Sequence, residues 1–226
     1  MIDEPQFQKH LRSLTFSADN IRIRLVSIIS AAIAVSRPNL TLTAMDFARD
    51  SDIPRPAIYE AVLQSYLFLG FPRMIEAALV YHEIFGDFEP GPDITAISVE
   101  ESKRWFADGH DLCKRVYGKN YERLKNKFMA VSPDIFRWMV IEGYGKVLSR
   151  PHLTNIEREL AEVAALIVDQ RERQLISHIL GSLNVGAART LIETVNDDIR
   201  PLAGEHGFRL ARKALASMSE KNETQE

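Results

Sequence analysis

Two ionisable side chains in the second half of the chain, Glu159 and His178, stand where proton chemistry is possible. Glu159 lies at the edge of the apolar side of a predicted helix that starts after the cap Thr154, whereas Glu162 and Arg158 are expected to point away. A carboxylate on an apolar face is costly unless it is paired or protonated, so Glu159 is expected to have a partner. The alternative is that Glu159 lies at the helix rim and caps it or pairs with an arginine.

His178 lies on the next predicted helix, on a polar stripe that it shares with Arg171 and Gln174. The adjoining face is apolar, which places His178 at a border between core and groove. Two antiparallel helices joined by a short link would bring Glu159 and His178 together. A carboxylate that holds an imidazole is a general acid–base unit, in which the histidine moves the proton and the glutamate fixes its tautomer. The alternative is a structural histidine with a satisfied hydrogen bond.

The elements that must position these residues are all helices. Apolar residues recur at helical spacing along most of the chain, and no period-2 strand pattern is convincing. Prolines and glycines divide the sequence into helix-sized pieces, which predicts an all-α protein. The predicted helices cover residues 5–16, 19–36, 43–50, 56–69, 73–86, 99–116, 119–129, 133–148, 155–169, 171–183, 187–200 and 204–219.

A weak internal repeat indicates how the chain is organised. When the second half is shifted back by 132 positions, Leu160 falls on Ile28 and Val163 on Ala31. We therefore expect an N-terminal repeat over 1–88, a linker over 89–98 and a C-terminal repeat over 99–226, together forming one compact unit. At this shift the positions of Glu159, Arg171, Gln174 and His178 correspond to Ser27, Asn39, Leu42 and Asp46, so one site per chain is expected.

Composition restricts the class of protein. The 28 basic and 31 acidic side chains give a net charge of -3, which argues against a polyphosphate or an acidic membrane as the main partner. The single cysteine, Cys113, excludes an intrachain disulfide, a redox pair and a cysteine-clustered zinc site. The basic run 114–127 is interpreted as a solvated helix face rather than a nucleic-acid site.

Targeting and membrane segments are not expected either. The first fifteen residues have no apolar run of the kind that secretory signals carry. The longest near-apolar stretch, 25–35, is too short to span a bilayer and predicts a buried core helix. We therefore expect a cytoplasmic protein with neither a membrane nor a nucleic-acid partner.

Several short motifs occur in a characteristic order between residues 144 and 187. They are the aromatic–glycine pair Tyr144-Gly145, the run Ser149-Arg150-Pro151 with Leu153, Arg158 with Leu160, His178, and the turn from Ser182 to Gly186. In this order they resemble the carboxymuconolactone decarboxylase family, which also includes the alkylhydroperoxidase-D-like proteins. The segments 116–124 and 58–77 are similar to that family as well. The resemblance implies an alkylhydroperoxidase-D-like multihelical bundle with two diverged repeats, assembled as a homo-oligomer.

The peroxidase branch of that family has a glutamate on one helix and two cysteines followed by a histidine on the next. Glu159 and His178 match the glutamate and the histidine, but Arg171 and Gln174 occupy the two cysteine positions. A dithiol cannot form from an arginine and a glutamine, and Cys113 lies on a different predicted helix. A peroxidase designation would therefore be inherited from the family without its chemistry.

The decarboxylase branch protonates the carbanion or enol that forms when a γ-lactone loses CO2. For this chain the resemblance implies a lyase that needs neither a metal nor another cofactor and acts on a small carboxylated or carbonyl substrate. His178 would donate the proton, Arg171 or Arg150 would hold the substrate carboxylate, and Gln174 would also contact the substrate. The alternative for Arg150 is that it ends a helix in front of Pro151.

An aromatic wall from the first half would complete such a site. Tyr66, Phe68 and Phe71 are the candidates, unless these rings are core or oligomer contacts. The second hypothesis, from another class of function, is a catalytically silent oligomer of the same family that binds a ligand or serves a structural role.

Overall fold

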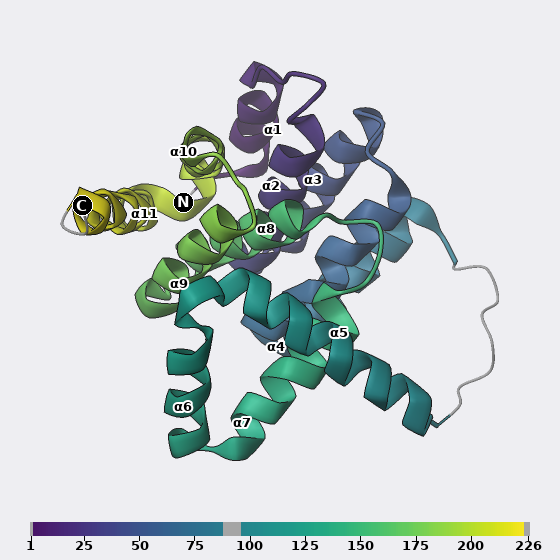
Figure 1. Ribbon diagram of the computed structural model, residues 1–226. Coiled ribbons are helices and arrows are strands. Elements are labelled where there is room, and N and C mark those ends of the chain that lie inside the picture. The colour runs from purple at the N-terminus through teal and green to yellow at the C-terminus, as the bar shows by residue number, and fades with distance from the viewer. Residues whose placement is uncertain (1, 88–95, 224–226) are drawn as a thin grey trace. The chain divides into compact units, whose positions relative to one another are not determined.

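The computed structural model describes residues 2–87 and 96–223, with side chains described as far as residue 218 (Figure 1). Within these ranges every regular element is a helix and no strand occurs. The all-α fold class that the helical spacing predicts is therefore confirmed. None of the described helices combines the length and the apolar character that crossing a membrane requires.

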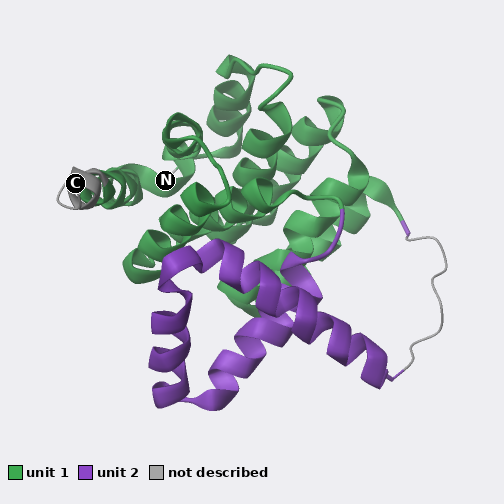
Figure 2. Cartoon of the chain, in the orientation of Figure 1, with its two compact units in different colours: residues 1–86, 152–226 green, residues 87–151 purple. Residues whose placement is uncertain are grey.

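The helices form two compact units (Figure 2). Unit 1 comprises residues 1–86 and 152–226, and unit 2 comprises residues 87–151. The first boundary lies beside the predicted linker 89–98, of which 89–95 fall outside the described residues. The second boundary, between Pro151 and His152, divides the segment 99–226 that the sequence comparison treats as one repeat. Unit 1 is thus assembled from both ends of the chain.

Unit 1 carries most of the helices. They are α1 (Glu4–Ser13), α2 (Ile21–Val35), α3 (Pro38–Asp50), α4 (Arg55–Phe85), α8 (Asn155–Val168), α9 (Glu172–Asn184), α10 (Arg189–Asp198) and α11 (Arg200–Glu223). α3 begins at Pro38 rather than near residue 43, because a proline in the first helical turn has no N–H that needs a partner. The predicted helices 56–69 and 73–86 are the two halves of α4. They meet at Gly70, whose φ of 80° suits a residue without a Cβ.

Unit 2 consists of α5 (Val99–Tyr117), the short turn η1 (Gly118–Asn120), α6 (Tyr121–Val131), α7 (Pro133–Trp138) and the π-helical segment η2 (Met139–Leu148). The backbones of α5 and η2 approach closely at two glycines. A Cβ on Gly109 would lie 2.0 Å from the Val140 carbonyl oxygen, and one on Gly145 would lie 1.9 Å from that of Trp105. Gly145, one of the residues that carry the family resemblance, therefore has a packing role.

The core of unit 1 is built on α2 and α8, which pack against each other. All residues from 24 to 34 of α2 and from 157 to 167 of α8 are buried. The buried core helix expected over 25–35 is therefore confirmed. α2 achieves this burial mostly with apolar residues, whereas α8 buries the charged residues Glu157, Arg158, Glu159 and Glu162.

The two halves of unit 1 have matching helix bounds. α2 begins at Ile21 and α8 at Asn155 (155 minus 21, a shift of 134), and α3 and α9 begin and end at the same shift. Positive φ angles at Ser36, Asp52 and Gly70 recur at Gln170, Gly186 and Gly204, again 134 residues further on. This register supports the predicted repeat, which remains a proposal.

The structural register differs from the sequence alignment by two residues. At a shift of 134 the positions that correspond to Glu159, Arg171, Gln174 and His178 are Leu25, Arg37, Leu40 and Ala44, instead of Ser27, Asn39, Leu42 and Asp46. The alignment gave a shift of 132 because α2 is mostly apolar and buried on all sides, so its sequence matches α8 almost equally well at shifts that differ by two residues.

Candidate functional site

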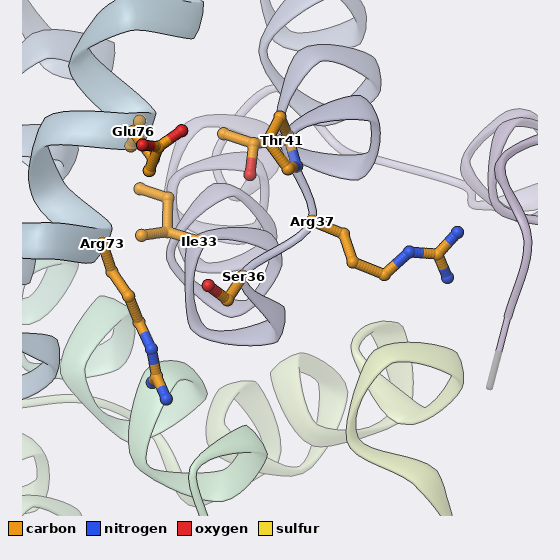
Figure 3. A pocket seen from close by; sticks show the side chains of 8 residues that line it. Ile33, Ser36, Arg37, Thr41, Arg73 and Glu76 are labelled. Carbon is orange, nitrogen blue, oxygen red and sulfur yellow. The ribbon is translucent and has the colours of Figure 1, made fainter.

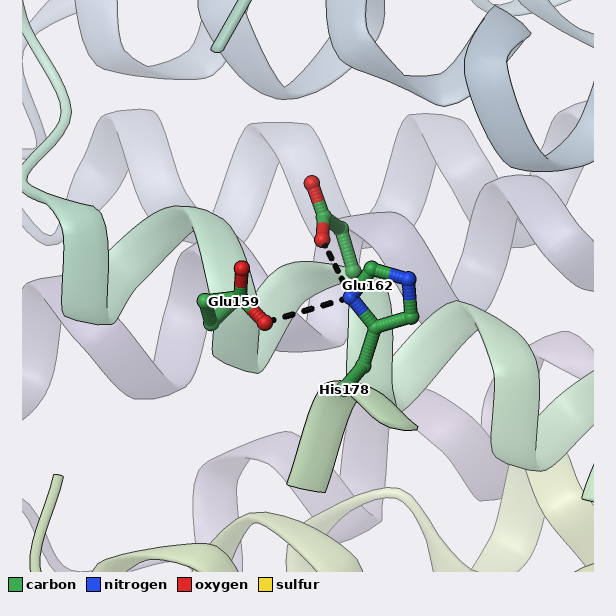
Figure 4. Close-up of side chains that lie close together, drawn as sticks. All are labelled: Glu159, Glu162 and His178. Atoms are coloured by element: carbon green, nitrogen blue, oxygen red, sulfur yellow. Dashed lines mark hydrogen bonds and ion pairs between the residues drawn. The ribbon is translucent and has the colours of Figure 1, made fainter. Parts of the chain in front are cut away.

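A trio of ionisable side chains lies where α8 and α9 pack together (Figure 4). The Thr154 cap accepts the N–H of Glu157 and starts α8, as the capping-box spacing predicts. α8 ends in a tight turn in which Gln170 has φ 57°, and α9 then folds back along α8. This pairing places His178 of α9 against Glu159 and Glu162 of α8.

The imidazole of His178 contacts both carboxylates through the same nitrogen. Nδ1 lies 3.1 Å from Oε2 of Glu159 and 2.8 Å from Oε2 of Glu162. The side chains are 6%, 3% and 0% exposed for His178, Glu159 and Glu162. The structure therefore brings together the glutamate and the histidine that the sequence pairs, and adds a second glutamate.

The positions of Glu162 and Arg158 correct the sequence analysis, which expected both to point away from the apolar side. Arg158 is buried and donates to Glu60 over 2.9 Å and to Gln64 over 3.0 Å. The expectation was wrong because α8 is buried on all sides, so no face of it leads to solvent. The i, i+3 spacing of Glu159 and Glu162 was the signal that could have found the second carboxylate.

The charged residues of α8 are compensated by partners. Glu157 pairs with Arg22, and Arg158 pairs with Glu60. These contacts pair the charged side chains at positions 157 and 158 of α8. The trio is a separate cluster on the side of α8 that faces α9. Buried charges persist only when they are paired, which explains why each acidic side chain of this helix faces a base.

Burial and charge act in opposite directions on the histidine. Burial lowers the pKa of His178. The negative charges of Glu162 and Glu159 and their hydrogen bonds raise this pKa by more than burial lowers it, to about 10. Burial and the neighbouring charge of Glu159 raise the pKa of Glu162 to about 7, although His178 and Arg158 oppose this rise. At neutral pH the imidazole is therefore protonated, and the raised pKa of Glu162 favours its protonated form more than in an exposed glutamate.

The outer nitrogen of the imidazole is the one that can act on a ligand. Nδ1 faces the carboxylates, so Nε2 points away from them (Figure 4). The ring of Phe68 packs edge-on against the imidazole, with centroids 5.1 Å apart and an interplanar angle of 89°. An imidazolium held in this way donates its remaining proton from Nε2.

The trio also has the donor set of a small metal site. One ligand atom from each of Glu159, Glu162 and His178 lies within 4.8 Å of the others. The contact of Glu162 with His178 is an ion pair of 2.8 Å, and both carboxylate oxygens of Glu162 are buried. Carboxylate and imidazole ligands suit several divalent metals. A cation here would have to displace the proton on Nδ1, so proton and metal are alternatives at one position.

A cavity of about 500 Å³ lies within one helical turn of the trio. It is lined by Leu67, Phe68, Leu69, Arg73, Leu166, Asp169, Arg171 and Gln174. Gln174 stands one turn before His178 on α9, and Leu166 stands one turn after Glu162 on α8. Phe68 both lines this cavity and contacts the imidazole, so it forms the wall between them.

Of the remaining residues that the sequence analysis singled out, some line the cavity and others do not. Of the expected aromatic wall, Phe68 lines the cavity, whereas Tyr66 stacks on Phe71, which is 58% exposed. Arg150 is an exposed residue of unit 2, so its suggested contact with a substrate remains a prediction. Cys113 is a buried residue of unit 2.

A smaller cavity of about 220 Å³ lies beside the turn between α2 and α3 (Figure 3). Figure 3 shows the guanidinium groups of Arg37 and Arg73 directed away from it. Arg37 donates to the carbonyl of Ile2 over 2.7 Å, and Arg73 donates to Asp169 over 2.7 Å. Neither guanidinium group is therefore available to a ligand in this cavity.

Fold and site together define an all-α protein with a buried Glu–Glu–His cluster beside a cavity that contains two arginines. No family model matches the sequence. The chain is similar to Peroxisomal protein 2 of Schizosaccharomyces pombe, with 26% identity over 190 residues that span 81% of this chain and 86% of that protein. This likeness extends over most of both chains and does not assign an activity.

Proposed function

We propose that this chain is a proton-transfer enzyme of the carboxymuconolactone decarboxylase type, acting on a small carboxylated or carbonyl substrate without a catalytic cysteine or metal. The observation that carries the proposal is the arrangement of His178. Its Nδ1 is held by Glu159 and Glu162, and its Nε2 is directed away from them. This is the arrangement of a histidine that delivers a proton and regains it without changing position.

The proposed step is a decarboxylation with protonation of carbon. The substrate loses CO2, and the electron pair of the broken C–C bond stays on the substrate as a carbanion or enolate. The Nε2 proton of His178 then bonds to that carbon, and water reprotonates the imidazole. Glu159 and Glu162 stabilise the imidazolium before the transfer, and their charge orients the ring.

The cavity beside the trio is the proposed substrate site. Arg171 and Gln174, which stand where a thiol peroxidase would carry its cysteines, line this cavity and would contact the substrate. A thiol peroxidase mechanism is not proposed, because it requires a dithiol that these side chains cannot form. Phe68 lines the cavity and packs against the imidazole, so it would have to turn aside for a substrate in the cavity to reach Nε2.

The test is turnover of carboxymuconolactone, followed as CO2 release, in the unmodified protein and in His178→Gln. Glutamine keeps an N–H for the carboxylates but has no transferable proton, so we expect a loss of about 100-fold or more. The matched control is His206→Gln at an exposed histidine, which should retain full turnover. Turnover that survives His178→Gln would contradict the proposal, and turnover that disappears after chelation would indicate a metal at the trio instead.

The alternative is a catalytically silent protein in which the trio is a structural ion cluster. The observation that favours it is burial, because the His178 side chain is only 6% exposed and Phe68 covers one side of it. In that case no decarboxylation is detected, and substitution of His178 changes only the stability of the protein.

A homo-oligomer remains part of the proposal. Phe71, Ile75 and Leu79 follow one another at four-residue spacing on α4 and are 58%, 49% and 60% exposed. Such a stripe is typical of a contact surface. Sedimentation should show a larger particle for the unmodified protein and a smaller one for Ile75→Lys.

The compartment is a separate question. Our expectation from the sequence is the cytoplasm, and the name of the fission yeast relative makes the peroxisome the alternative. Fluorescent fusions at either end of the chain, imaged beside a peroxisomal marker, distinguish the two.

A further inference from the structure

One carboxylate in the cavity wall is shared by two arginines from different parts of unit 1. Arg73 of α4 donates from Nη1 to Oδ1 of Asp169 over 2.7 Å. Arg171, at the start of α9, donates from Nε to Oδ2 of the same residue over 2.6 Å. Each carboxylate oxygen therefore holds one guanidinium, and the three side chains form an Arg–Asp–Arg bridge at the cavity.

The bridge carries an excess of one positive charge. Burial raises the pKa of Asp169, but the hydrogen bonds from Arg171 and Arg73 lower it by more, so the carboxylate stays ionised. Two guanidinium groups then face a single carboxylate. Arg73 is 31% and Arg171 is 64% exposed, and both line the cavity, so their remaining N–H groups are accessible to a ligand.

The rest of the cavity wall is largely apolar. Leu67, Phe68, Leu69 and Leu166 line it together with the bridge. A volume of about 500 Å³ lies within the range that small-molecule sites occupy. A ligand that fits these walls therefore has a short apolar part and a negatively charged end.

We propose that this cavity binds a small carboxylate, one carboxylate group of which contacts Arg73 and Arg171 while its carbon chain lies against Leu166 and Phe68. One carboxylate charge neutralises the bridge, and the apolar walls favour a ligand with a carbon chain over inorganic phosphate, which has none. The inference rests on the proposed function, because it names the substrate class of that site. It adds Arg73, a binding residue from the first half of the chain.

The experiment measures binding of hexanoate and of hexanol to the full chain by ligand-observed NMR or calorimetry. We expect hexanoate to bind at least tenfold more tightly than hexanol, because only the anion gains charge-assisted hydrogen bonds. Arg73→Gln and Arg171→Gln should each weaken hexanoate about tenfold while leaving hexanol unchanged. Arg49→Gln is the matched control, since Arg49 also pairs with aspartates but lies on α3 away from this cavity.

A variant that is expected to raise hexanoate affinity separates a loss of binding contacts from a loss of folding. Asp169→Asn removes the negative charge that competes for both guanidiniums, so hexanoate affinity should rise by about threefold or more, which a damaged fold would not produce. Equal binding of hexanoate and hexanol, indifference to both arginine substitutions, or tighter binding of inorganic phosphate would overturn the inference.

The two proposals can fail separately. His178→Gln should retain hexanoate binding, because the carboxylate lies at the arginines and not at the imidazole. If hexanoate binding follows the arginines while turnover survives His178→Gln, the proton-transfer function fails and the carboxylate site stands. If turnover requires His178 but the arginine substitutions do not change hexanoate binding, the carboxylate site fails and the proton-transfer function stands.

Discussion

The helix pairs α2–α3 and α8–α9 of unit 1 begin at corresponding residues at a shift of 134, and they bury different side chains at corresponding positions. Where α8 and α9 hold Glu159, Glu162 and His178, α2 and α3 hold Leu25, Ile28 and Ala44, all of them buried. Apolar packing alone is sufficient to build such a pair. A buried charged cluster is rarely more stable than well-packed apolar residues of similar volume, so the fold by itself does not require the trio.

The largest effect is expected on turnover, when the trio of α8 and α9 is replaced by apolar residues like those at the corresponding positions of α2 and α3. Glu159→Leu, Glu162→Ile and His178→Leu, made together, should abolish turnover while the free energy of unfolding stays unchanged or rises by up to about 4 kcal/mol. Leucine replaces the histidine because an alanine would leave a void beside Phe68. Circular dichroism, urea unfolding and CO2 release test this together. A triple variant that fails to fold would show that the trio is structural.

Breaking the trio at one position should be more harmful to stability than removing it. His178→Leu alone leaves two buried glutamates without their cation, so we expect a destabilisation of about 3–5 kcal/mol in urea unfolding at pH 8. Part of this loss should be recovered at pH 5, where the carboxyl groups take up protons. If the single and the triple variant have equal stability, the three groups are not coupled.

A second comparison concerns two buried arginines that are also 134 residues apart, Arg24 and Arg158. Arg24 pairs with Asp198 over 2.7 Å, and Arg158 pairs with Glu60 over 2.9 Å and with Gln64 over 3.0 Å. Arg24→Met and Arg158→Met should each cost about 3–5 kcal/mol in unfolding free energy, because each removes a buried guanidinium that is paired with a buried carboxylate. Strongly unequal losses would count against equivalent roles in the two halves.

The last comparison concerns the pH dependence of stability. The pKa of His178 is raised to about 10, so its contribution to stability is fully present below pH 6.5 and lost as the pH rises to 10. The pKa of Glu162 is raised to about 7, so its protonated form stabilises the fold at low pH, and this contribution is lost between about pH 4.5 and 7. The unfolding free energy of the unmodified protein should therefore decrease from pH 5 to 10 more steeply than that of the triple variant. Parallel pH profiles would contradict these shifts.

Several features of the site could be predicted from the sequence because the signals are local. The capping box at Thr154 marks the start of α8, and helical spacing puts Glu159 and His178 on facing sides of two neighbouring helices. Glu162 was missed because a helical-wheel argument assumes one solvent face, and α8 has none. Arg73 was missed because it lies 96 residues from Asp169, and nothing in its own neighbourhood indicates that contact.

By itself the sequence determined the helical fold class and the approximate positions of most helices, since periodicity, prolines and caps act over a few residues. It also determined that Arg171, which precedes α9, and Gln174 on α9 stand in place of a pair of cysteines. Only the tertiary structure decided that unit 1 joins both ends of the chain and that two carboxylates share one imidazole nitrogen. The same holds for the Arg–Asp–Arg bridge at the cavity. These features depend on which buried charges meet across helix interfaces, and that is set by packing and desolvation rather than by spacing along the chain.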